Sequence, residues 1–441
     1  MEKYYHSVTL DQDKCMGCTN CIKRCPTEAI RVREGKAVII NERCIDCGEC
    51  ILICPYHAKV AVTDPLSKIQ PFRYKIALPA PALYGQFKDI KDINKILSSL
   101  LEIGFDEVFE VARAAEYVSN FIKETLEADG LSKPLISSAC PAVVRLIQVR
   151  FPELLNNIAR VESPMEIAAQ LARSEFMEKH NVSSDEIGVF FITPCAAKMT
   201  SIKNPIGNEK SNVNGAISIL EIYSLIIDKI KVNKPRNLQQ ASRTGIKWAV
   251  SNGESSSLGI ENYLAVDGIH NVIRVLEEIE NNKLNKLDFL EALCCTGGCV
   301  GGPLTFENNY VANNRIKRLI KEVDTSPVSL ENTGLVKDKV NWKLQKSIMK
   351  KSVLKLDQSI SSAIKKMKEM DRIYDSLPGL DCGSCGSPSC RTLAEDIVRG
   401  VASEMDCVFK LRERVKSLAE EMIEISDKLP TSRKGDNNND T

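Results

Sequence analysis

The strongest chemical signal in this 441-residue chain is the spacing of its 17 cysteines. Eight of them form two copies of the pattern Cys-x2-Cys-x2-Cys-x3-Cys-Pro between residues 15 and 54. This spacing is typical of a bacterial ferredoxin with two 4Fe-4S clusters, in which the fourth Cys of each copy ligates the other cluster. The alternative, structural zinc, uses pairs of cysteines rather than two interlocked quartets. The predicted ligand sets are Cys15, Cys18, Cys21 and Cys54 for one cluster and Cys25, Cys44, Cys47 and Cys50 for the other.

Four further cysteines near the end of the chain indicate another tetrathiolate site. They are Cys382, Cys385, Cys390 and Cys407, in the pattern Cys-x2-Cys-x4-Cys followed by a distant Cys. The intervening residues 392–405 predict a short helix that carries the last Cys back to the loop. We expect a third 4Fe-4S cluster here. Zinc stays an alternative, because a single tetrathiolate set does not identify its metal.

The remaining five cysteines lie in three separate loops. The loops with Cys140 and Cys195 each follow an apolar run that predicts a strand, 134–136 and 187–192, and each precedes a predicted helix. Loops at the carboxyl ends of parallel strands are where α/β folds bind ligands. Four cubanes need sixteen thiolates, so the fourth set is predicted as Cys140, Cys195, Cys295 and Cys299, with Cys294 left over.

These three loops resemble the three signature segments of iron-iron (FeFe) hydrogenases. The family pattern Thr-Ser-Cys-Cys-Pro corresponds to Ser-Ser-Ala-Cys-Pro at 137–141, and Met-Pro-Cys-x-x-Lys corresponds to Thr-Pro-Cys-Ala-Ala-Lys at 193–198. The third pattern, Glu-x-Met-Ala-Cys-x-x-Gly-Cys-x-x-Gly-Gly, corresponds to residues 291–302. The resemblance covers roughly residues 1–310 and is specific, because the segments occur in the family's order behind a ferredoxin unit.

The resemblance implies a particular active site. A 4Fe-4S cubane on the fourth cysteine set would be joined through Cys299 to a two-iron unit that carries CO, cyanide and a bridging amine dithiolate. Lys198 would donate a hydrogen bond to a cyanide ligand, as suits a cation beside an anionic group. The residues expected to let the backbone approach these ligands, or to line them, are Ser138, Pro194, Gly297, Gly298, Gly301 and Gly302. The implied reaction is reversible H2 oxidation, with electrons passed through the accessory clusters to a ferredoxin-like redox partner, and the implied maturation requires the family's dedicated enzymes.

The departures from the family pattern concern proton delivery. Ala139 replaces the thiol that in the family passes protons to and from the site, and a methyl group can do neither. Ser201 replaces a glutamate, and Leu293 replaces a methionine. We therefore expect slow turnover. With the extra C-terminal cysteine domain, the chain resembles the sensory branch of the family, which implies an H2-sensing role and a signalling partner.

A second function stays open. The chain could be a hydrogenase-like electron-transfer or regulatory subunit that keeps the cubane and lacks the two-iron unit, as in cytosolic iron–sulfur assembly. A third, a multi-cluster ferredoxin fused to an inert scaffold, leaves the order of the three loops unexplained.

The elements that position these cysteines predict a mixed α/β architecture. A two-cluster α+β ferredoxin domain (1–63) precedes an α/β catalytic-type domain with parallel sheets (64–335), a helical connector (336–376) and a four-Cys domain with a last helix (377–429). Helices of the catalytic-type domain are predicted at 90–101, 142–150, 164–180, 217–232 and 270–280.

The C-terminal part predicts two long helices. Residues 342–377 predict one continuous connecting helix, and residues 408–429 predict an amphipathic helix that pairs with it or with a partner chain, as in a homodimer. The polar residues 430–441 predict a disordered tail.

Composition and charge exclude several other classes of protein. A formal net charge of +1 gives no electrostatic case for nucleic acid or an anionic membrane. No apolar run reaches the length of a membrane span, and the first residues lack the apolar core of a signal peptide, so we expect a cytoplasmic protein. Clustered thiols in that compartment usually bind metal rather than form disulfides.

Overall fold

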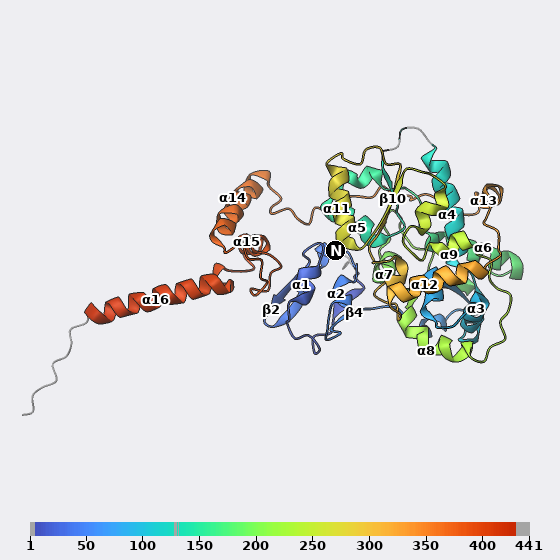
Figure 1. Cartoon of the computed structure of the whole chain (residues 1–441), viewed down its shortest axis with the longest axis horizontal. Coiled ribbons are helices and arrows are strands. Elements are labelled where there is room, and N and C mark those ends of the chain that lie inside the picture. Colours follow the sequence, from blue (N-terminus) through green and yellow to red (C-terminus); the bar gives the residue numbers. More distant parts are fainter. Residues whose placement is uncertain (1–4, 128–129, 131, 429–441) are drawn as a thin grey trace, which may run out of the picture.

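The computed structural model describes residues 5–127, 130 and 132–428. The N-terminal unit lies between the C-terminal segment and a larger α/β unit that contains the middle of the chain (Figure 1). The predicted tail, residues 430–441, lies outside the described residues.

The N-terminal unit has the small sheets and short helices of a ferredoxin. β1 (Val8–Leu10) pairs antiparallel with β4 (Lys59–Ala61), and β2 (Ile30–Arg33) pairs antiparallel with β3 (Lys36–Ile39). Glu34 and Gly35 both have positive φ, which is the geometry of a tight hairpin turn that matches the twist of its strands. The two helices, α1 (Asn20–Arg24) and α2 (Glu49–Leu52), each follow a loop with two cysteines and contain the third, Cys21 in α1 and Cys50 in α2.

The α/β unit contains two parallel sheets. The first has the order β6-β5-β8-β9, with β6 at Glu107–Val108, β5 at Tyr74–Pro79, β8 at Ile187–Thr193 and β9 at Gly215–Ser218. The second has the order β10-β11-β7, with β10 at Tyr263–Asp267, β11 at Phe289–Leu293 and β7 at Leu135–Ile136. Every residue of β8 and β11 is buried, as expected for parallel strands covered on both faces.

Helices cover both sheets and confirm the five helices predicted for this unit. These five are α3 (Ile93–Glu102), α5 (Pro141–Arg150), α6 (Pro164–His180), α8 (Ile219–Ile230) and α11 (Ile269–Glu280). The others are α4 (Val111–Leu126), α7 (Ala196–Lys203), α9 (Arg243–Lys247), α10 (Gly253–Leu258), α12 (Asn309–Leu319) and α13 (Leu330–Val336). Serine, asparagine or aspartate side chains cap several of them, such as Asp92 at α3 and Asn308 at α12.

The prediction of one continuous helix over 342–377 is wrong in its first half. Only α14 (Ile360–Ser376) is helical, because the preceding backbone bonds to the α/β unit instead of to itself. The amide of Lys346 donates to the Gly207 carbonyl at 2.8 Å, and the Gln148 side chain donates to the Met349 carbonyl at 2.7 Å. Trp342 is buried and stacks on Phe121 at 5.4 Å. The segment before α14 is therefore an irregular strap fastened to the α/β unit.

The helix predicted at 392–405 is shorter than expected. α15 (Cys390–Val398) ends early because Gly400 adopts a positive φ, and the amide of Val401 reaches back to the Asp396 carbonyl at 2.9 Å. This arrangement is the usual glycine-terminated helix end. A short turn, Glu404–Asp406, then leads to Cys407.

The last helix, α16 (Val408–Lys428), confirms the prediction of a helix here. It extends away from the rest of the chain (Figure 1), and none of its residues is buried. No helix among the described residues, α16 included, is long and apolar enough to cross a membrane.

Candidate active site

Three loops at the carboxyl ends of parallel strands meet in one place, as predicted. Cys140 follows β7 and starts α5, while Cys195 follows β8 of the other sheet and starts α7. Cys295 and Cys299 follow β11. All four cysteines line one cavity of about 100 Å³. The structure thus brings together thiols that are far apart in the sequence.

A buried arginine that the sequence analysis missed links the helices that follow two of these loops. Arg145 of α5 has no exposed surface and donates to the carbonyl oxygens of Ala197 (3.2 Å) and Asn204 (3.3 Å), at the two ends of α7. Because α5 and α7 begin at Cys140 and Cys195, this side chain fixes the distance between them. Helix periodicity could not identify Arg145, since its partners belong to another helix.

Two of the predicted glycines line the cavity, and each permits a close approach of backbone to backbone. A Cβ atom on Gly302 would lie 2.3 Å from the Pro194 carbonyl oxygen, and one on Gly298 would lie 2.6 Å from the Ser251 amide nitrogen. Gly297 and Gly301 do not line the cavity; they shape the turn, and the Gly297 amide donates to Asp267 at 3.0 Å. These glycines therefore allow the backbone of the third loop to pack directly against the backbone of its neighbours.

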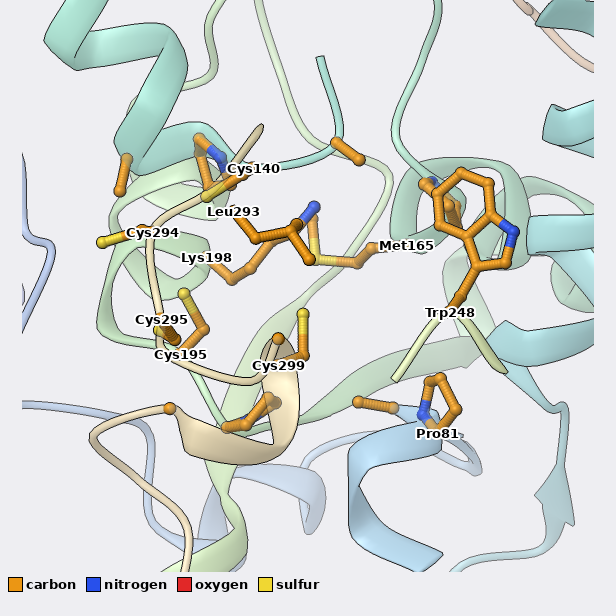
Figure 2. A pocket seen from close by; sticks show the side chains of 18 of the residues that line it. Pro81, Cys140, Met165, Cys195, Lys198, Trp248, Leu293, Cys294, Cys295 and Cys299 are labelled. Atoms are coloured by element: carbon orange, nitrogen blue, oxygen red, sulfur yellow. The ribbon is translucent and has the colours of Figure 1, made fainter. Parts of the chain in front are cut away.

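Lys198 is placed inside the cavity, as the sequence analysis expected. Figure 2 shows its side chain passing between Cys140 and Cys299 toward Met165. The rest of the wall is largely apolar and includes Pro81, Val111, Met165, Phe191, Trp248 and Leu293. An ammonium group in such a wall is a strong donor, because little water competes for it.

Cys294, which the sequence analysis left over, also lines this cavity, but it differs from the other four cysteines in where its sulfur points. Its side chain points away from Lys198 and Cys299 in Figure 2, and its Sγ lies 3.8 Å from the Cys47 carbonyl oxygen. It is 3% exposed and packs where the third loop meets the ferredoxin unit.

The chemistry of the four remaining thiols fits an iron–sulfur cluster. Burial raises the pKa of Cys299 well above its usual value, and the sulfurs of Cys295, Cys140 and Cys195 raise it further. The Lys198 ammonium acts in the opposite direction on the same thiol. Four buried thiols that face one another become stable thiolates when a metal cluster supplies positive charge.

A pair of buried glutamates borders the same cavity and was not predicted. Glu254, at the start of α10, is 3% exposed, and burial together with the charge of Glu291 raises its pKa to about 8. The Ser137 hydroxyl donates to the Glu254 carboxylate, with Oγ at 2.7 and 2.9 Å from its two oxygens. The amide of Ala139 in turn donates to the Ser137 oxygen at 3.2 Å. No local motif marks Glu254, since Ser137 is 117 residues away.

A second, more polar cavity of about 60 Å³ lies on the other side of Lys198. Ser138 lines this cavity and not the first, and its hydroxyl donates to the Val161 carbonyl at 2.7 Å. Ser201 also lines it. Burial raises the pKa of Glu162 in this cavity to about 7, and Lys198 opposes that shift. Glu162 thus provides a carboxyl group near Lys198, in the cavity that Ser201 also lines.

The two ferredoxin quartets are also assembled. Cys15, Cys18, Cys21 and Cys54 line one cavity, and Cys25, Cys44, Cys47 and Cys50 line another, which matches the two predicted ligand sets. Cys47 belongs to the second quartet and also lines the cavity with Lys198. The second quartet therefore adjoins the candidate active site.

The C-terminal quartet docks on the opposite side of the ferredoxin unit. Cys385, Cys382 and Cys407 lie near one another, and Cys390 and Cys407 are buried in the same small core. The amide of Val32 donates to the Gly386 carbonyl at 2.8 Å, and Val32 also lines the cavity of the first quartet. The four cysteine sets therefore follow one another from the C-terminal unit to the cavity with Lys198.

Three known protein families match three successive regions of the chain. The family described as the C-terminal domain of the iron-only hydrogenase large subunit matches residues 73–259 and 230–303, which together span more than half of the chain. A 4Fe-4S dicluster domain matches residues 7–55, and a family described as an Fe-S cluster matches residues 377–409.

The individual relatives include both hydrogenases and Fe-S cluster assembly factors. The chain is 23% identical to iron hydrogenase 1 of Clostridium pasteurianum over 76% of its own length and 73% of that protein. It is 22% identical to a probable cytosolic Fe-S cluster assembly factor, oxy-4 of Caenorhabditis elegans, over 53% of its own length and 62% of that protein. Among solved structures, a variant of the [FeFe]-hydrogenase HydA1 from Chlamydomonas reinhardtii has a TM-score of 0.48 at 16% identity, over 64% of this chain and 95% of that one.

Proposed function

The chain belongs to the family of the iron-only hydrogenase large subunit, and from that premise we propose that it is a hydrogenase of low activity that interconverts H2 with protons and electrons. The observation that carries the proposal is the convergence of Cys140, Cys195, Cys295 and Cys299 on one apolar cavity that Lys198 enters. A scaffold that only transfers electrons has no need of the lysine.

The residues of the cavity fit the family's cofactor. The four cysteines would hold a 4Fe-4S cubane, with Cys299 also ligating the two-iron unit, and that unit supplies the H2 chemistry when it is bound. Lys198 would donate a hydrogen bond to a cyanide ligand. The apolar wall around Trp248 and Met165 excludes water, which strengthens each polar contact inside.

The cysteine sets support a path for electrons through the chain. A cluster on Cys25, Cys44, Cys47 and Cys50 would adjoin the active site, because Cys47 lines both cavities. The first ferredoxin cluster and the C-terminal cluster would follow, and a ferredoxin-like partner or a signalling protein would exchange electrons there. We further propose that the family's maturation enzymes insert the two-iron unit, that the protein is cytoplasmic and that its cellular role is H2 sensing.

A second candidate function has its own support. The similarity to a cytosolic Fe-S cluster assembly factor favours a protein that keeps the cubane without the two-iron unit. Ala139 and Ser201 also suit a site that moves no protons. The two functions differ in whether CO and cyanide are present.

Infrared spectroscopy of protein matured with the two-iron precursor decides between these functions. A hydrogenase shows CO and cyanide stretches that shift under H2. Their absence from a protein whose iron content shows the cubanes to be present would establish the electron-transfer function instead. Iron analysis should give about sixteen cubane irons, and zinc in the C-terminal unit would contradict the fourth cluster.

Replacing Ala139 by Cys should raise the H2 turnover of the matured protein. Ala139 lines the cavity and has no proton to exchange, so a thiol there adds a proton donor beside the cofactor. We expect a gain of about 10-fold or more in turnover with unchanged CO and cyanide bands. Ala139→Ser is the matched control, because its hydroxyl has similar size and much weaker acidity. Equal turnover in all three proteins would contradict the assigned role of this position.

A further inference from the structure

The two halves of the ferredoxin unit have different side chains at one equivalent buried position. Ile30 follows the last Cys of the first copy of the cysteine pattern by five residues, and Lys59 follows the last Cys of the second copy by the same interval. Each starts a strand, β2 or β4, and they are only 3% and 2% exposed. In both copies the amide of the preceding alanine donates to the sulfur of that last Cys, at 3.2 and 3.3 Å. The backbone is therefore equivalent, whereas the side chain changes from an apolar group to an ammonium.

The ammonium of Lys59 is directed to the first quartet and has no other partner. Lys59 lines the cavity of the first quartet, and Ile30 lines that of the second. The Lys59 nitrogen is buried and makes no hydrogen bond to the residues that the structure describes. By contrast, Lys36 near the same quartet donates to the carbonyl oxygens of Gln12 and Cys15, both at 2.8 Å. Because a buried ammonium without a partner is costly, Lys59 fits a cavity that holds a negatively charged group.

The charge of Lys59 acts on the thiols of that quartet. Burial raises the pKa of Cys21, and the Lys59 ammonium lowers it. Burial also raises the pKa of Cys54, but the backbone amide of Lys59, two neighbouring amides and the same ammonium bring it below its usual value. The ammonium also opposes the effect of burial on Cys50 of the second quartet, whose pKa still stays well above its usual value. A cation that favours thiolates also favours the negative charge of a cluster bound to them.

The second quartet has a buried carboxylate beside it instead. Asp46 is 1% exposed, and its oxygen lies 4.0 Å from the Cys44 sulfur, at the position that corresponds to Gly17 in the first copy. Burial raises the pKa of Cys44, and the charge of Asp46 raises it further. The same carboxylate contacts the His6 ring at 2.8 Å and accepts from the Val8 amide at 3.0 Å. Clusters on the two quartets would therefore lie beside charges of opposite sign.

We propose that the Lys59 ammonium donates to the sulfurs of the first ferredoxin cluster and makes it the more easily reduced of the two. Reduction adds one negative charge to a cluster, so a nearby cation raises its reduction potential and a nearby carboxylate lowers it. An electron that arrives from the active site through the second cluster then passes to the first. This step transfers one electron and forms or breaks no bond. The proposal goes beyond the proposed function, since it needs only the two ferredoxin clusters.

The location of the first cluster gives this order of potentials a consequence. Val32 lines the first cavity, and its amide donates to the Gly386 carbonyl of the C-terminal unit at 2.8 Å. Lys23 of the neighbouring helix α1 also donates to the carbonyl oxygens of Asp381 and Pro388. Lys59 would therefore hold the electron next to the contact between the ferredoxin unit and the C-terminal unit.

Lys59→Ile tests the proposal, because isoleucine already occupies the equivalent buried position in the other half. The measurement is a redox titration of the full chain, loaded with its 4Fe-4S clusters and followed by electron paramagnetic resonance. We expect the midpoint potential of the first cluster to fall by about 59 mV or more, which is a tenfold shift of a one-electron equilibrium. The iron content and the potential of the C-terminal cluster should not change.

Lys14→Met is the matched control for the loss of charge. It removes an ammonium one residue from Cys15, but this side chain is 59% exposed and pairs with Asp11 at 3.0 Å. Its charge is screened by water, so every midpoint potential should stay as in wild type. Cys18→Ser and Cys44→Ser each alter one predicted ligand, of the first and of the second cluster, and so identify the two signals.

Two results would overturn the proposal. One is a first-cluster potential in Lys59→Ile that matches the potential in Lys14→Met. The other is a wild-type protein whose second cluster is reduced at the higher potential. Neither result bears on the infrared test of the hydrogenase function, because the titration needs no two-iron unit.

An independent observation concerns α16. Six of its exposed apolar residues follow a strict alternation of three- and four-residue steps: Val408, Leu411, Val415, Leu418, Met422 and Ile425. This seven-residue repeat is typical of the seam of a coiled coil rather than of the broader face of a helix that packs on a globular core. The helix extends away from the rest of the chain, which leaves the seam exposed (Figure 1).

We propose that α16 of a second copy covers this seam in an antiparallel arrangement. The argument is charge complementarity at Arg414 and Glu421, which flank the seam on one side and lie 3.9 Å apart within one helix. In an antiparallel pair centred near Leu418, each Arg414 faces the partner helix's glutamate at position 421, twice per dimer. In a parallel pair the same two residues would face Ala419 and Ser426, which carry no charge.

Sedimentation of the full chain tests the pairing. We expect a dimer that Leu418→Lys converts to a monomer, while Ser417→Lys, on the adjacent polar face, leaves it intact. R414E alone should weaken the dimer, and the double variant R414E/E421R should restore it. A monomeric wild-type chain overturns the pairing, and a dimer indifferent to R414E overturns the antiparallel arrangement.

Discussion

Cys299→Ala should abolish H2 turnover and remove every CO and cyanide band from protein treated with the two-iron precursor. Cys299 lines the cavity beside Lys198, and in the proposed site its sulfur ligates both the cubane and the two-iron unit. An alanine leaves the two-iron unit without its protein bond and the cubane with three thiolates. Infrared spectroscopy and H2 uptake measure the two losses together.

The adjacent surplus cysteine provides the control for this experiment. Cys294→Ala removes a buried sulfur of the same loop, but one that points toward the ferredoxin unit. We expect its bands, iron content and turnover to match wild type, with a stability cost of about 1 kcal/mol from the small void. Retained bands in Cys299→Ala, or lost bands in Cys294→Ala, would show that the ligand set is wrongly assigned.

The second large effect is expected at Asp396, which attaches the C-terminal unit to the ferredoxin unit. Its carboxylate bonds to Arg31 (2.6 and 3.0 Å), Arg33 (2.9 Å) and the hydroxyl of Ser387 (3.0 Å), and both Arg31 and Asp396 are 5% exposed. Asp396→Ala leaves a buried guanidinium without its partner, a loss on the order of 3–5 kcal/mol. We expect the C-terminal unit to detach.

Limited proteolysis and iron analysis measure that detachment. The strap before α14 should become sensitive to protease, and electron transfer between the C-terminal cluster and the ferredoxin clusters should slow. Asp371→Ala, on the exposed face of α14, is the control and should behave as wild type. Loss of about four irons in Asp396→Ala would indicate unfolding of the unit, and unchanged protease resistance would show that the ion pair contributes little to docking.

The parts of the fold that sequence predicted are those set by local pattern. Apolar residues at helical spacing located α11 almost to the residue, since this helix buries one face. The bounds of α6 were also predicted, although its first turns are buried on every side. The strap at Trp342 was missed because its backbone partners belong to the α/β unit. The spacing of apolar residues indicates which face of a helix or strand is buried, but it carries no information on hydrogen bonds to distant elements.

The residues of the candidate site also divide into those that the sequence predicted and those that only the structure identified. Cysteine spacing predicted the two ferredoxin quartets, because their ligand loops are short and repeat one pattern. The four cysteines beside Lys198 are scattered, so their prediction depended on the strands that precede them, on the count of remaining thiols and on the family resemblance. Glu254 and Arg145 could not be found, since each acts through partners in distant elements. The role of Ser138 stays a prediction: its hydroxyl donates to the Val161 carbonyl, and it lines the neighbouring cavity, which Lys198 also lines.

The ion pair between Arg31 and Asp396 joins positions 365 residues apart, and this has a consequence for biosynthesis. The loops of the first two clusters are complete once β4 has been made, whereas their C-terminal cover forms only when nearly the whole chain has left the ribosome. During translation, Arg31 of the N-terminal unit is therefore exposed to solvent until Asp396 has been synthesised. We expect the two ferredoxin clusters to be loaded first, through the face that α15 later closes.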